Sequence, residues 1–466
     1  MTAVTSTSPA GVDPARVGAL LERELEVFAD HHPRTRSLHE RARGSLLDGV
    51  PMSWMVKWAG PFPLFLESAS GAHAICADGH DYADLCLGDT GAMAGHGPAP
   101  VIAAVERQLR RGITTMLPTE DAAWVGLELA RRFGLPSWQF TLTATDANRF
   151  SLRIARAITG RALVAVHEWC YHGSVDESFA VLDGSPADPF GSRRVVARAG
   201  NTGPAVDPAM TTRVVPFNNL EALDAALRDG QVAALLIEPA LTNVGIVLPE
   251  PGYLEGVREI TRRHGTILIH DETHTICAGP GGVTGAGGYE PDILVIGKTI
   301  GGGIPVAAYG LSDDIVGRLR AVEAYRDSDV GGIGGTLAGY ALSMAAARAT
   351  LGEVLTEAAF ERMVPLAARW ADGVEGVIAR HAAPWSVTRL GARAEYHFMP
   401  DPPRDGAEQI AHVDTDLERL LHLWVMNRGV LMTPFHNMAL MSPATTEADV
   451  DRHTAAFDEA LAALFG

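Results

Sequence analysis

Hydrophobic residues recur along the chain with two periods, one typical of helices and one typical of strands. Helical periodicity predicts helices over residues 14–28, 119–133 and 147–159. Short apolar runs predict strands over residues 64–67, 72–77, 138–143 and 162–167. Between the first helix and residue 63, Gly and Pro residues break the pattern. The alternation of helices with strands predicts an α/β fold with a mostly parallel sheet covered by helices.

Three apolar runs in the middle of the chain have the composition of buried strands, and each ends in polar residues. They are Val232–Ile237 before Glu238, residues 266–269 before His270 and Asp271, and Ile293–Ile296 before Gly297 and Lys298. Ligands of open α/β sheets bind at the carboxyl ends of the strands, so we expect Glu238, Asp271 and Lys298 to converge there. The glycines at 301–303 let backbone approach such a ligand closely.

The last third of the chain has a different pattern. Long Ala- and Leu-rich helices follow residue 339, then weaker strands near 386–398 and 430–433, then a closing helix over 447–464. This pattern predicts a smaller α/β domain built from both chain ends. The expected division is a flexible tail at 1–14, small-domain segments at 15–95 and 340–466, and a large domain at 96–339.

Composition narrows the choice of partners. The formal net charge of −18 repels nucleic acid and anionic lipid, and no apolar stretch is long enough to cross a bilayer. The four cysteines are widely spaced without CxxC pairs, which argues against a zinc site or a disulfide framework and fits a cytoplasmic protein. Small molecules are therefore the expected partners.

Lys298 and Asp271 together predict a specific chemistry. A lysine at the end of a buried strand is partly desolvated, which favours the neutral amine that forms Schiff bases. A buried carboxylate such as Asp271 can keep a pyridine nitrogen protonated, and the protonated ring is a strong electron sink. Taken singly, Asp271 could cap a helix and Lys298 could be a solvated loop lysine. Their combination favours a cofactor that needs both groups, pyridoxal 5′-phosphate.

Two other motifs predict nothing further. Gly297-Lys298-Thr299 imitates the end of a phosphate-binding P-loop, but Asp292 stands where that motif requires glycine. His270 and His274 flank Asp271 without the HExxH pattern of a metal site. A packed strand histidine is the simpler interpretation, although His274 remains a candidate for substrate contact.

The residues around these strand ends resemble the class III aminotransferases, a branch of the fold-type I enzymes that use pyridoxal 5′-phosphate. Residues 291–303 resemble the family's lysine motif, and residues 269–273 resemble its strand ending in Asp-Glu. Residues 78–84 and 95–96 resemble its N-terminal landmarks. The family includes glutamate-1-semialdehyde aminomutase and β-amino acid aminotransferases. The resemblance is clear over about residues 45–350 and implies a large sheet domain plus a smaller α/β domain.

The resemblance also implies roles around the cofactor ring. Tyr171, in Tyr171-His172-Gly173, would stack on one face of the ring. Thr273 takes the place of a usually aliphatic residue behind the ring, and its hydroxyl has backbone as an alternative partner. Glu238 and Asn243 are further candidate cofactor-binding residues.

A second set of residues would bind the phosphate. The turn Thr143-Ala144-Thr145 leads from a strand into a helix, whose free N–H groups and positive dipole end favour an anion. It corresponds to the family's Ser-Gly-Thr, with Ala144 in place of glycine and Asp146 in place of glutamate. The alternative is a threonine N-cap without a ligand. Thr336, in Gly335-Thr336-Leu337, resembles the segment that reaches the phosphate of a neighbouring subunit, which implies a homodimer with shared active sites.

These residues predict an aminotransferase with a ping-pong mechanism that moves an amino group between an amine or amino acid and a keto acid. Lys298 would form a Schiff base with the cofactor and then act as general base. For the substrate carboxylate, Lys57 and Arg393 are alternative partners, and Trp54 suggests an apolar or aromatic pocket wall. The shared motifs leave an aminomutase or a racemase open, and a ligand-binding protein without activity is the alternative from another class.

Overall fold

The computed structural model describes residues 10–184, 193–322 and 332–466. Contacts between Cα atoms divide the chain into two compact units. Unit 1 comprises Met1–Pro98, Glu361–Pro403 and Ala411–Gly466, and unit 2 comprises Ala99–Phe360 and Arg404–Ile410. Unit 1 is therefore assembled from both ends of the chain, with unit 2 inserted between them in sequence.

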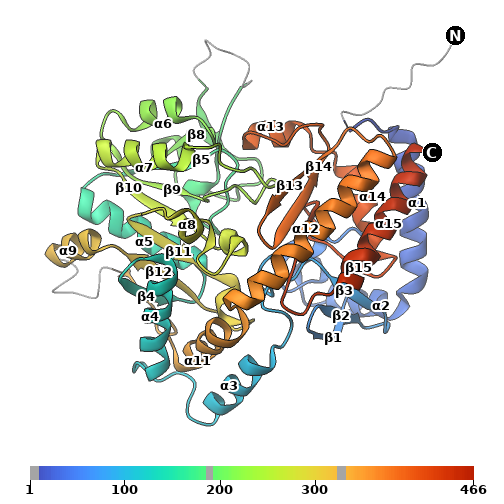
Figure 1. Cartoon of the computed structure of the whole chain (residues 1–466), viewed down its shortest axis with the longest axis horizontal. Coiled ribbons are helices and arrows are strands. Elements are labelled where there is room, and N and C mark those ends of the chain that lie inside the picture. The colour runs from blue at the N-terminus through green and yellow to red at the C-terminus, as the bar shows by residue number, and fades with distance from the viewer. Residues whose placement is uncertain (1–9, 185–192, 323–331) are drawn as a thin grey trace. The chain divides into compact units, whose positions relative to one another are not determined.

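Unit 2 is built on a seven-stranded sheet with the order β4-β12-β11-β10-β9-β5-β8 (Figure 1). The strands are β4 (Ser137–Thr141), β5 (Leu163–His167), β8 (Thr212–Val215), β9 (Val232–Ile237), β10 (Ile267–Asp271), β11 (Ile293–Ile296) and β12 (Ala307–Leu311). β12 pairs antiparallel with both β11 and β4, and the other pairs are parallel. The mostly parallel sheet predicted from the sequence is confirmed.

Helices cover this sheet because its strands are apolar on both faces. All six residues of β9 are buried, which requires a helical layer on each side. The helices of unit 2 are α3 (Ala99–Leu109), α4 (Glu120–Phe133), α5 (Ala144–Thr159), α6 (Leu220–Leu227), α7 (Tyr253–His264), α8 (Gly282–Gly287), α9 (Asp313–Ala321) and α11 (Ala341–Ala349). A separate two-stranded sheet joins β6 (Ala180–Leu182) to β7 (Val195–Ala197).

Unit 1 contains two small sheets. One has the order β1-β2-β3-β15 and the other β13-β14-β16. The strands are β1 (Leu66–Ser70), β2 (His73–Cys76), β3 (Asp81–Asp84), β13 (Ser386–Leu390), β14 (Arg393–His397), β15 (Val430–Leu431) and β16 (Met438–Leu440). The helices are α1 (Pro14–His31), α2 (Pro33–Ala42), α12 (Glu357–Arg380), α14 (Thr415–Met426) and α15 (Glu447–Phe465), and α13 (Gly406–Ala411) belongs largely to unit 2.

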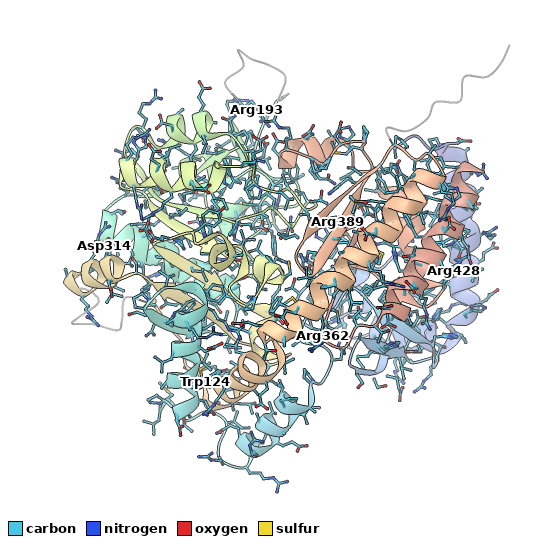
Figure 2. The ribbon with its side chains drawn as sticks, in the orientation of Figure 1. Trp124, Arg193, Asp314, Arg362, Arg389 and Arg428 are labelled. Carbon is cyan, nitrogen blue, oxygen red and sulfur yellow. The ribbon has the colours of Figure 1, made fainter. Side chains whose placement is uncertain are left out.

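An arginine at the end of α14 ties three helices of unit 1 together. The guanidinium of Arg428, labelled in Figure 2, lies 3.9 Å from the centroid of the Trp424 ring. It also pairs with the carboxylates of Glu24 on α1, at 3.2 Å, and Glu459 on α15, at 2.9 Å. Because Glu24 is buried, this pairing satisfies a carboxylate that burial alone would destabilise. Among the described residues, no helix is both long enough and apolar enough to span a bilayer.

The structure differs from the sequence-based expectations at several places. Residues 10–13 do not belong to a flexible tail, because Ala10 and Val12 are buried and the Trp385 indole donates to the Ala10 carbonyl; residues 1–9 lie outside the described residues. The segment expected to be broken contains α2, which starts at Pro33 as a proline in the first helical turn favours. Unit 2 extends past residue 339 to Phe360, because α11 packs against α3 and α4.

Candidate active site

A cavity of about 250 Å³ lies in unit 2 at the carboxyl ends of β10 and β11. Asp271 is the last residue of β10, and Lys298 follows β11 after one glycine. The two strands are parallel neighbours, with Asp271 paired in register with Val295. The wall of the cavity consists of Leu142, Thr143, Ala144, Thr145, Tyr171, His172, Gly173, Asp271, Thr273, His274, Lys298, Pro305 and Val306.

The carboxylate of Asp271 is held by three donors. His172 Nδ1 donates to its Oδ2 at 2.9 Å, Asn148 Nδ2 donates to the same oxygen at 2.8 Å, and the backbone N–H of Thr273 donates to Oδ1 at 3.1 Å. Burial alone would raise the pKa of Asp271, but these hydrogen bonds and the charge of His172 lower it below its ordinary value. Asp271 is therefore a buried carboxylate that stays ionised at neutral pH.

His172 shows the complementary shift. Burial by itself would lower the pKa of His172, but the neighbouring Cys170 and the hydrogen bond to Asp271 raise it to about 10. Imidazolium and carboxylate thus stabilise each other at buried positions, where His172 is 1% and Asp271 3% exposed. Asn148, which donates to Asp271, also donates to the His172 carbonyl at 3.1 Å. The Asp271 carboxylate is therefore a negative charge held in a fixed position at the cavity wall.

Lys298 has an unusual backbone conformation. Its φ is 51°, in the left-handed region that costs a residue with a side chain about 1–2 kcal/mol. The residue before it is a glycine at a crowded position. A Cβ on Gly297 would lie 3.0 Å from the Cβ atoms of both Ala144 and Ala307. The Lys298 ammonium lies 2.7 Å from His274 Nε2. A strained residue at a cavity wall is typical of functional sites.

The N-terminus of α5 forms another part of the cavity wall. The helix begins at Ala144, three residues earlier than the sequence predicted, because the Thr143 hydroxyl caps it by accepting from the Asp146 N–H at 3.2 Å. Ala144 and Thr145 therefore occupy the first helical turn, where N–H groups lack partners within the helix and the dipole is positive. The predicted turn is confirmed as a helix N-terminus, and it opens into the cavity.

Gly173 is needed where this turn meets the loop after β5. Its φ is 76°, and a Cβ there would lie 2.0 Å from Thr145 Oγ1. The close approach lets the Ser174 N–H donate to that same hydroxyl at 3.1 Å. The loop that carries Tyr171 and His172 is thus fixed to the first turn of α5.

Glu238 lies behind the cavity and positions Tyr171. Its carboxylate accepts from the Tyr171 N–H at 3.1 Å, and from the N–H and hydroxyl of Thr242 at 3.1 and 2.5 Å. Burial raises the pKa of Glu238. Strand β9, which ends at Ile237, delivers this carboxylate beneath the loop, so Glu238 contacts a residue of the cavity wall without lining the cavity.

The remaining sequence-predicted residues are not among those that line this cavity. Asn243 is half-buried in the loop after β9 and Thr336 is exposed in a turn of unit 2; neither lines the cavity. Lys57 and Trp54 lie on a short 3₁₀ helix of unit 1, where the Trp54 ring packs edge-on against Phe435. Arg393 lies in β14 of unit 1, fully buried, and donates to the Thr90 hydroxyl.

Two residues that position the carboxylate were not predicted as site residues. Asn148 belongs to α5, and His172 was noted only as part of the Tyr-His-Gly segment. Both are at most 1% exposed. Asn148 carries a sequence signal, because it is an amide on the helix face that is otherwise formed by Ala147, Ser151, Leu152 and Ala155. A polar group on a buried helix face needs a partner, and the partner here is Asp271.

A larger hollow of about 600 Å³ lies in unit 2 at the other end of β11. Two of its arginines are already paired: Arg258 binds both oxygens of Asp292 at 2.8 Å, and Arg132 binds Glu128 at 2.7 Å. It contains no lysine. The chemistry belongs to the smaller cavity, which unites an amine, an ionised carboxylate and a helix N-terminus.

These three groups fit the three ends of pyridoxal 5′-phosphate. The amine of Lys298 suits the aldehyde, the carboxylate of Asp271 suits the ring nitrogen, and the first turn of α5 suits the phosphate. Between them, the Thr273 hydroxyl is buried at the cavity wall and has no hydrogen-bond partner among the described residues, as expected of a polar atom that faces a ligand. The fold and the site define an enzyme of fold type I that uses pyridoxal 5′-phosphate.

Comparisons with known proteins identify the family. The model of the class III aminotransferases matches residues 54–461, and the chain belongs to this family. A glutamate-1-semialdehyde 2,1-aminomutase of Sorangium cellulosum is 34% identical over 444 residues, which cover 93% of this chain and 98% of the relative. The cofactor and fold class predicted from the sequence are thereby confirmed.

Solved structures agree with this assignment. The crystal structure of a glutamate-1-semialdehyde aminomutase from Pseudomonas aeruginosa PAO1 is 49% identical, with a TM-score of 0.94 over 97% of this chain and 99% of that one. A variant of the same enzyme, similar to the same degree, was solved in complex with PMP. An omega-transaminase from Sphaerobacter thermophilus is 29% identical, with a TM-score of 0.82 over 92% and 97% of the two chains.

Proposed function

We propose that this enzyme is an aminomutase that moves an amino group between neighbouring carbons of an amino aldehyde such as glutamate 1-semialdehyde. The observation that carries the amino-transfer chemistry is the single cavity in which Lys298 faces a carboxylate held ionised by His172 and Asn148. The names of the relatives favour transfer of the amino group within one molecule. One of these relatives is 49% identical over nearly the whole of both chains. This assignment replaces intermolecular transamination as the leading hypothesis.

The bound cofactor supplies an aldehyde that bonds covalently to an amine and a protonated ring that accepts electrons. Asp271 would hold the proton on the ring nitrogen, because its lowered pKa keeps it ionised. The first turn of α5, with Thr143, Ala144 and Thr145, would bind the phosphate. Tyr171 and Thr273 would lie against the ring, and Lys298 would carry the proton between the substrate carbon and the cofactor.

The same site serves a second candidate function, transamination between an amine or amino acid and a keto acid. This alternative is supported by the omega-transaminase with its TM-score of 0.82, since the residues that bind the cofactor are shared by both reactions. The two functions make different demands on the substrate. A transaminase needs a separate keto acceptor to complete its cycle, whereas an aminomutase converts one substrate without an acceptor.

For the substrate carboxylate, Lys57 and Arg393 remain candidates, with Trp54 as an apolar neighbour. Lys57 is exposed, whereas Arg393 is fully buried and already donates to Thr90. We therefore favour Lys57. The substitution Lys57→Ala should raise the KM for an amino acid substrate with little change in kcat, because it removes binding that is equal in ground and transition states. If Lys57→Ala and Arg393→Ala both leave KM unchanged, the carboxylate binds elsewhere.

We further propose that the enzyme is a cytoplasmic homodimer with shared active sites. Unit 2 exposes large apolar side chains close together in sequence, with Met116 78% and Leu117 71% accessible. Exposed apolar groups of this kind are typical of surfaces that another chain covers. Thr336 is exposed and outside the cavity of its own chain, which suits a residue that reaches the phosphate in the second subunit. Light scattering after size exclusion should give twice the 49.4 kDa chain mass.

The covalent contact can be tested without ambiguity, because Lys57 and Lys298 are the two lysines of the sequence. The purified protein is expected to absorb visible light, and borohydride reduction followed by peptide mass analysis should place the cofactor on Lys298. Lys298→Ala should abolish the covalent adduct, and Lys57→Ala, the matched control, should retain it. Attachment at Lys57, or a colourless protein after reconstitution, would refute the proposal.

The reaction type is tested with the same preparation. Glutamate 1-semialdehyde, incubated in large excess over the holoenzyme with no added keto acid, should be converted to its isomeric amino ketone over many turnovers. A transaminase would stop after a single half-reaction and resume when a keto acid is added. The second result would overturn the aminomutase assignment and leave the amino-transfer chemistry intact.

A further inference from the structure

A histidine touches the amine of Lys298. The Nε2 atom of His274 lies 2.7 Å from Lys298 Nζ, and both side chains line the same cavity. His274 is 7% exposed. The ring therefore meets the one atom of this chain on which the covalent chemistry of the site depends.

The turn that carries His274 is fixed from below by a buried carboxylate. Glu272 accepts from the N–H groups of Val283 and Thr284 at 3.1 and 2.6 Å, and from the Thr275 hydroxyl. Its own carbonyl accepts from the Ile276 N–H at 2.9 Å, and its N–H donates to Val295 on β11. The backbone before His274 is thus bonded to β11, the strand that leads to Lys298, and the backbone after His274 is bonded to Glu272, so the fold fixes the position of this turn.

Lys298 must lose a proton before its amine can bond to a carbon, so it needs a base close by. A protonated amine has no lone pair and cannot attack a carbon, and in water at neutral pH only about one lysine in 10³ is neutral. A base that takes the proton must lie about 2.6–3.2 Å from the nitrogen, and His274 does. An imidazole has a suitable intrinsic affinity for a proton, since its ordinary pKa is about 6.5.

We propose that His274 is the base that removes the proton from the Lys298 ammonium when Lys298 bonds to the cofactor. In this step the N–H bond of Nζ breaks, its electron pair stays on Nζ as a lone pair, and the proton bonds to Nε2. No other bond changes and no co-reactant is needed. The inference rests on the proposed function, and it assigns to His274 a role in the same site.

Apart from Lys298 and His274, the titratable groups around the cavity are Tyr171, His172 and Asp271. Two of these are already paired with each other. His172 donates to Asp271 through Nδ1, and Asp271 already accepts from three groups. Glu272, beneath the turn, points to backbone N–H groups of 283 and 284. His274 is the residue of this wall whose contact with the Lys298 amine is 2.7 Å.

The test follows the covalent step directly. The full-length chain, freed of cofactor, is mixed with saturating pyridoxal 5′-phosphate, and the rise of visible absorbance is recorded between pH 6 and pH 9. For the wild-type chain, the logarithm of the rate should rise with pH and level off where an imidazole has lost its proton. A continuous rise with unit slope up to pH 9 would overturn the proposal without the use of any variant.

Two substitutions separate proton transfer from hydrogen bonding. His274→Leu should slow the step about 100-fold or more at pH 7, the usual contribution of a general base, and the loss should shrink as pH rises toward the range in which lysine deprotonates unaided. His274→Gln offers an acceptor that does not take up a proton, so it should be as slow as His274→Leu. A rate restored by Gln would reduce His274 to a positioning residue and refute the proposal.

Controls distinguish a failure of the role of His274 from a failure of the proposed function. His264→Gln alters a histidine at the end of α7 that pairs with Asp224, and it should leave the profile unchanged. Near-ultraviolet circular dichroism checks that each variant is folded. If the wild-type chain gives an absorbance band and the variants form it equally fast, only the role of His274 fails. If no chain gives a band, the proposed function fails, and the role of His274 fails with it.

Discussion

The contact between Gly173 and Thr145 leads to a prediction whose size can be worked out from the structure. In Gly173→Ala the new Cβ would lie 2.0 Å from Thr145 Oγ1 and 3.0 Å from Thr145 Cβ, at a φ of 76°. The left-handed backbone costs about 1–2 kcal/mol for alanine. The overlap adds about 1–3 kcal/mol, as overpacking does elsewhere, and the hydrogen bond from Ser174 to Thr145 is worth about 1 kcal/mol. The expected loss is about 3–6 kcal/mol, a large part of the usual stability of a protein.

A matched control isolates the steric part of this loss. Gly160, at the end of α5, has a φ of 68°, and a Cβ there meets nothing within 4 Å. Gly160→Ala should therefore cost only the backbone term of about 1–2 kcal/mol. Urea denaturation of both variants gives the difference, which should be at least about 2 kcal/mol.

A third variant and a binding measurement complete the test. Thr145→Ala removes the hydroxyl that the new Cβ would strike, so the double variant should be more stable than the sum of the two single effects predicts. Gly173→Ala should also weaken binding of pyridoxal 5′-phosphate, because it displaces the first turn of α5, whereas Gly160→Ala should not. Equal stability of the two alanine variants would refute the packing argument.

Further predictions concern the carboxylate and its partners. Asp271→Asn should lower the rate of amino transfer by about 100-fold or more, measured as product formed by the holoenzyme at saturating substrate, because a fixed charge opposite the ring is lost; a rate within a few fold of wild type would contradict the role of Asp271. The pKa of His172 is raised to about 10, above the value of about 6.5 in an unfolded chain, so its contribution to stability is fully present below pH 6.5 and is lost as pH rises through 10. His172→Gln should therefore be destabilised most near pH 6, with a gap in urea midpoint that narrows by pH 10, and a gap independent of pH would exclude an ionic pair. Asn148→Leu removes a donor to a charged oxygen and should cost about 1.5–3 kcal/mol in urea denaturation, and an unchanged midpoint would show that the bond is not stabilising.

The parts of the fold that follow from local pattern were predictable. Strands β9 and β11 were predicted with their observed bounds, because their runs of Val, Leu and Ile end abruptly at charged or glycine residues. Helix α5 was predicted three residues short, because capping by Thr143 depends on a hydroxyl geometry that apolar periodicity does not reveal. Helix α2 was missed for a related reason: only Thr35 is buried in it, so its sequence lacks an apolar stripe.

The residues of the candidate site that directly follow a strand were predictable from the sequence. The residues that other elements bring against them were not. Lys298 and Asp271 follow directly from strand ends, and the structure places both in one cavity. The neighbours that set their properties come from other elements: His172 is 99 residues from Asp271, and Asn148 is 123. Such pairings arise from the order of strands in the sheet, which a single sequence does not specify. The contact between His274 and Lys298 is of the same kind.

Helix α5 contributes to both ends of the cavity at once. Its first residue, Ala144, lines the end suited to a phosphate, and Asn148, one turn further on, is bonded to the carboxylate suited to a ring nitrogen. At a rise of about 1.5 Å per residue, the four steps from Ala144 to Asn148 span about 6 Å along the helix axis. We therefore expect the helix to favour a cofactor of matching length. Pyridoxal lacks the phosphate and would be held at one end only, so it should bind more weakly than pyridoxal 5′-phosphate.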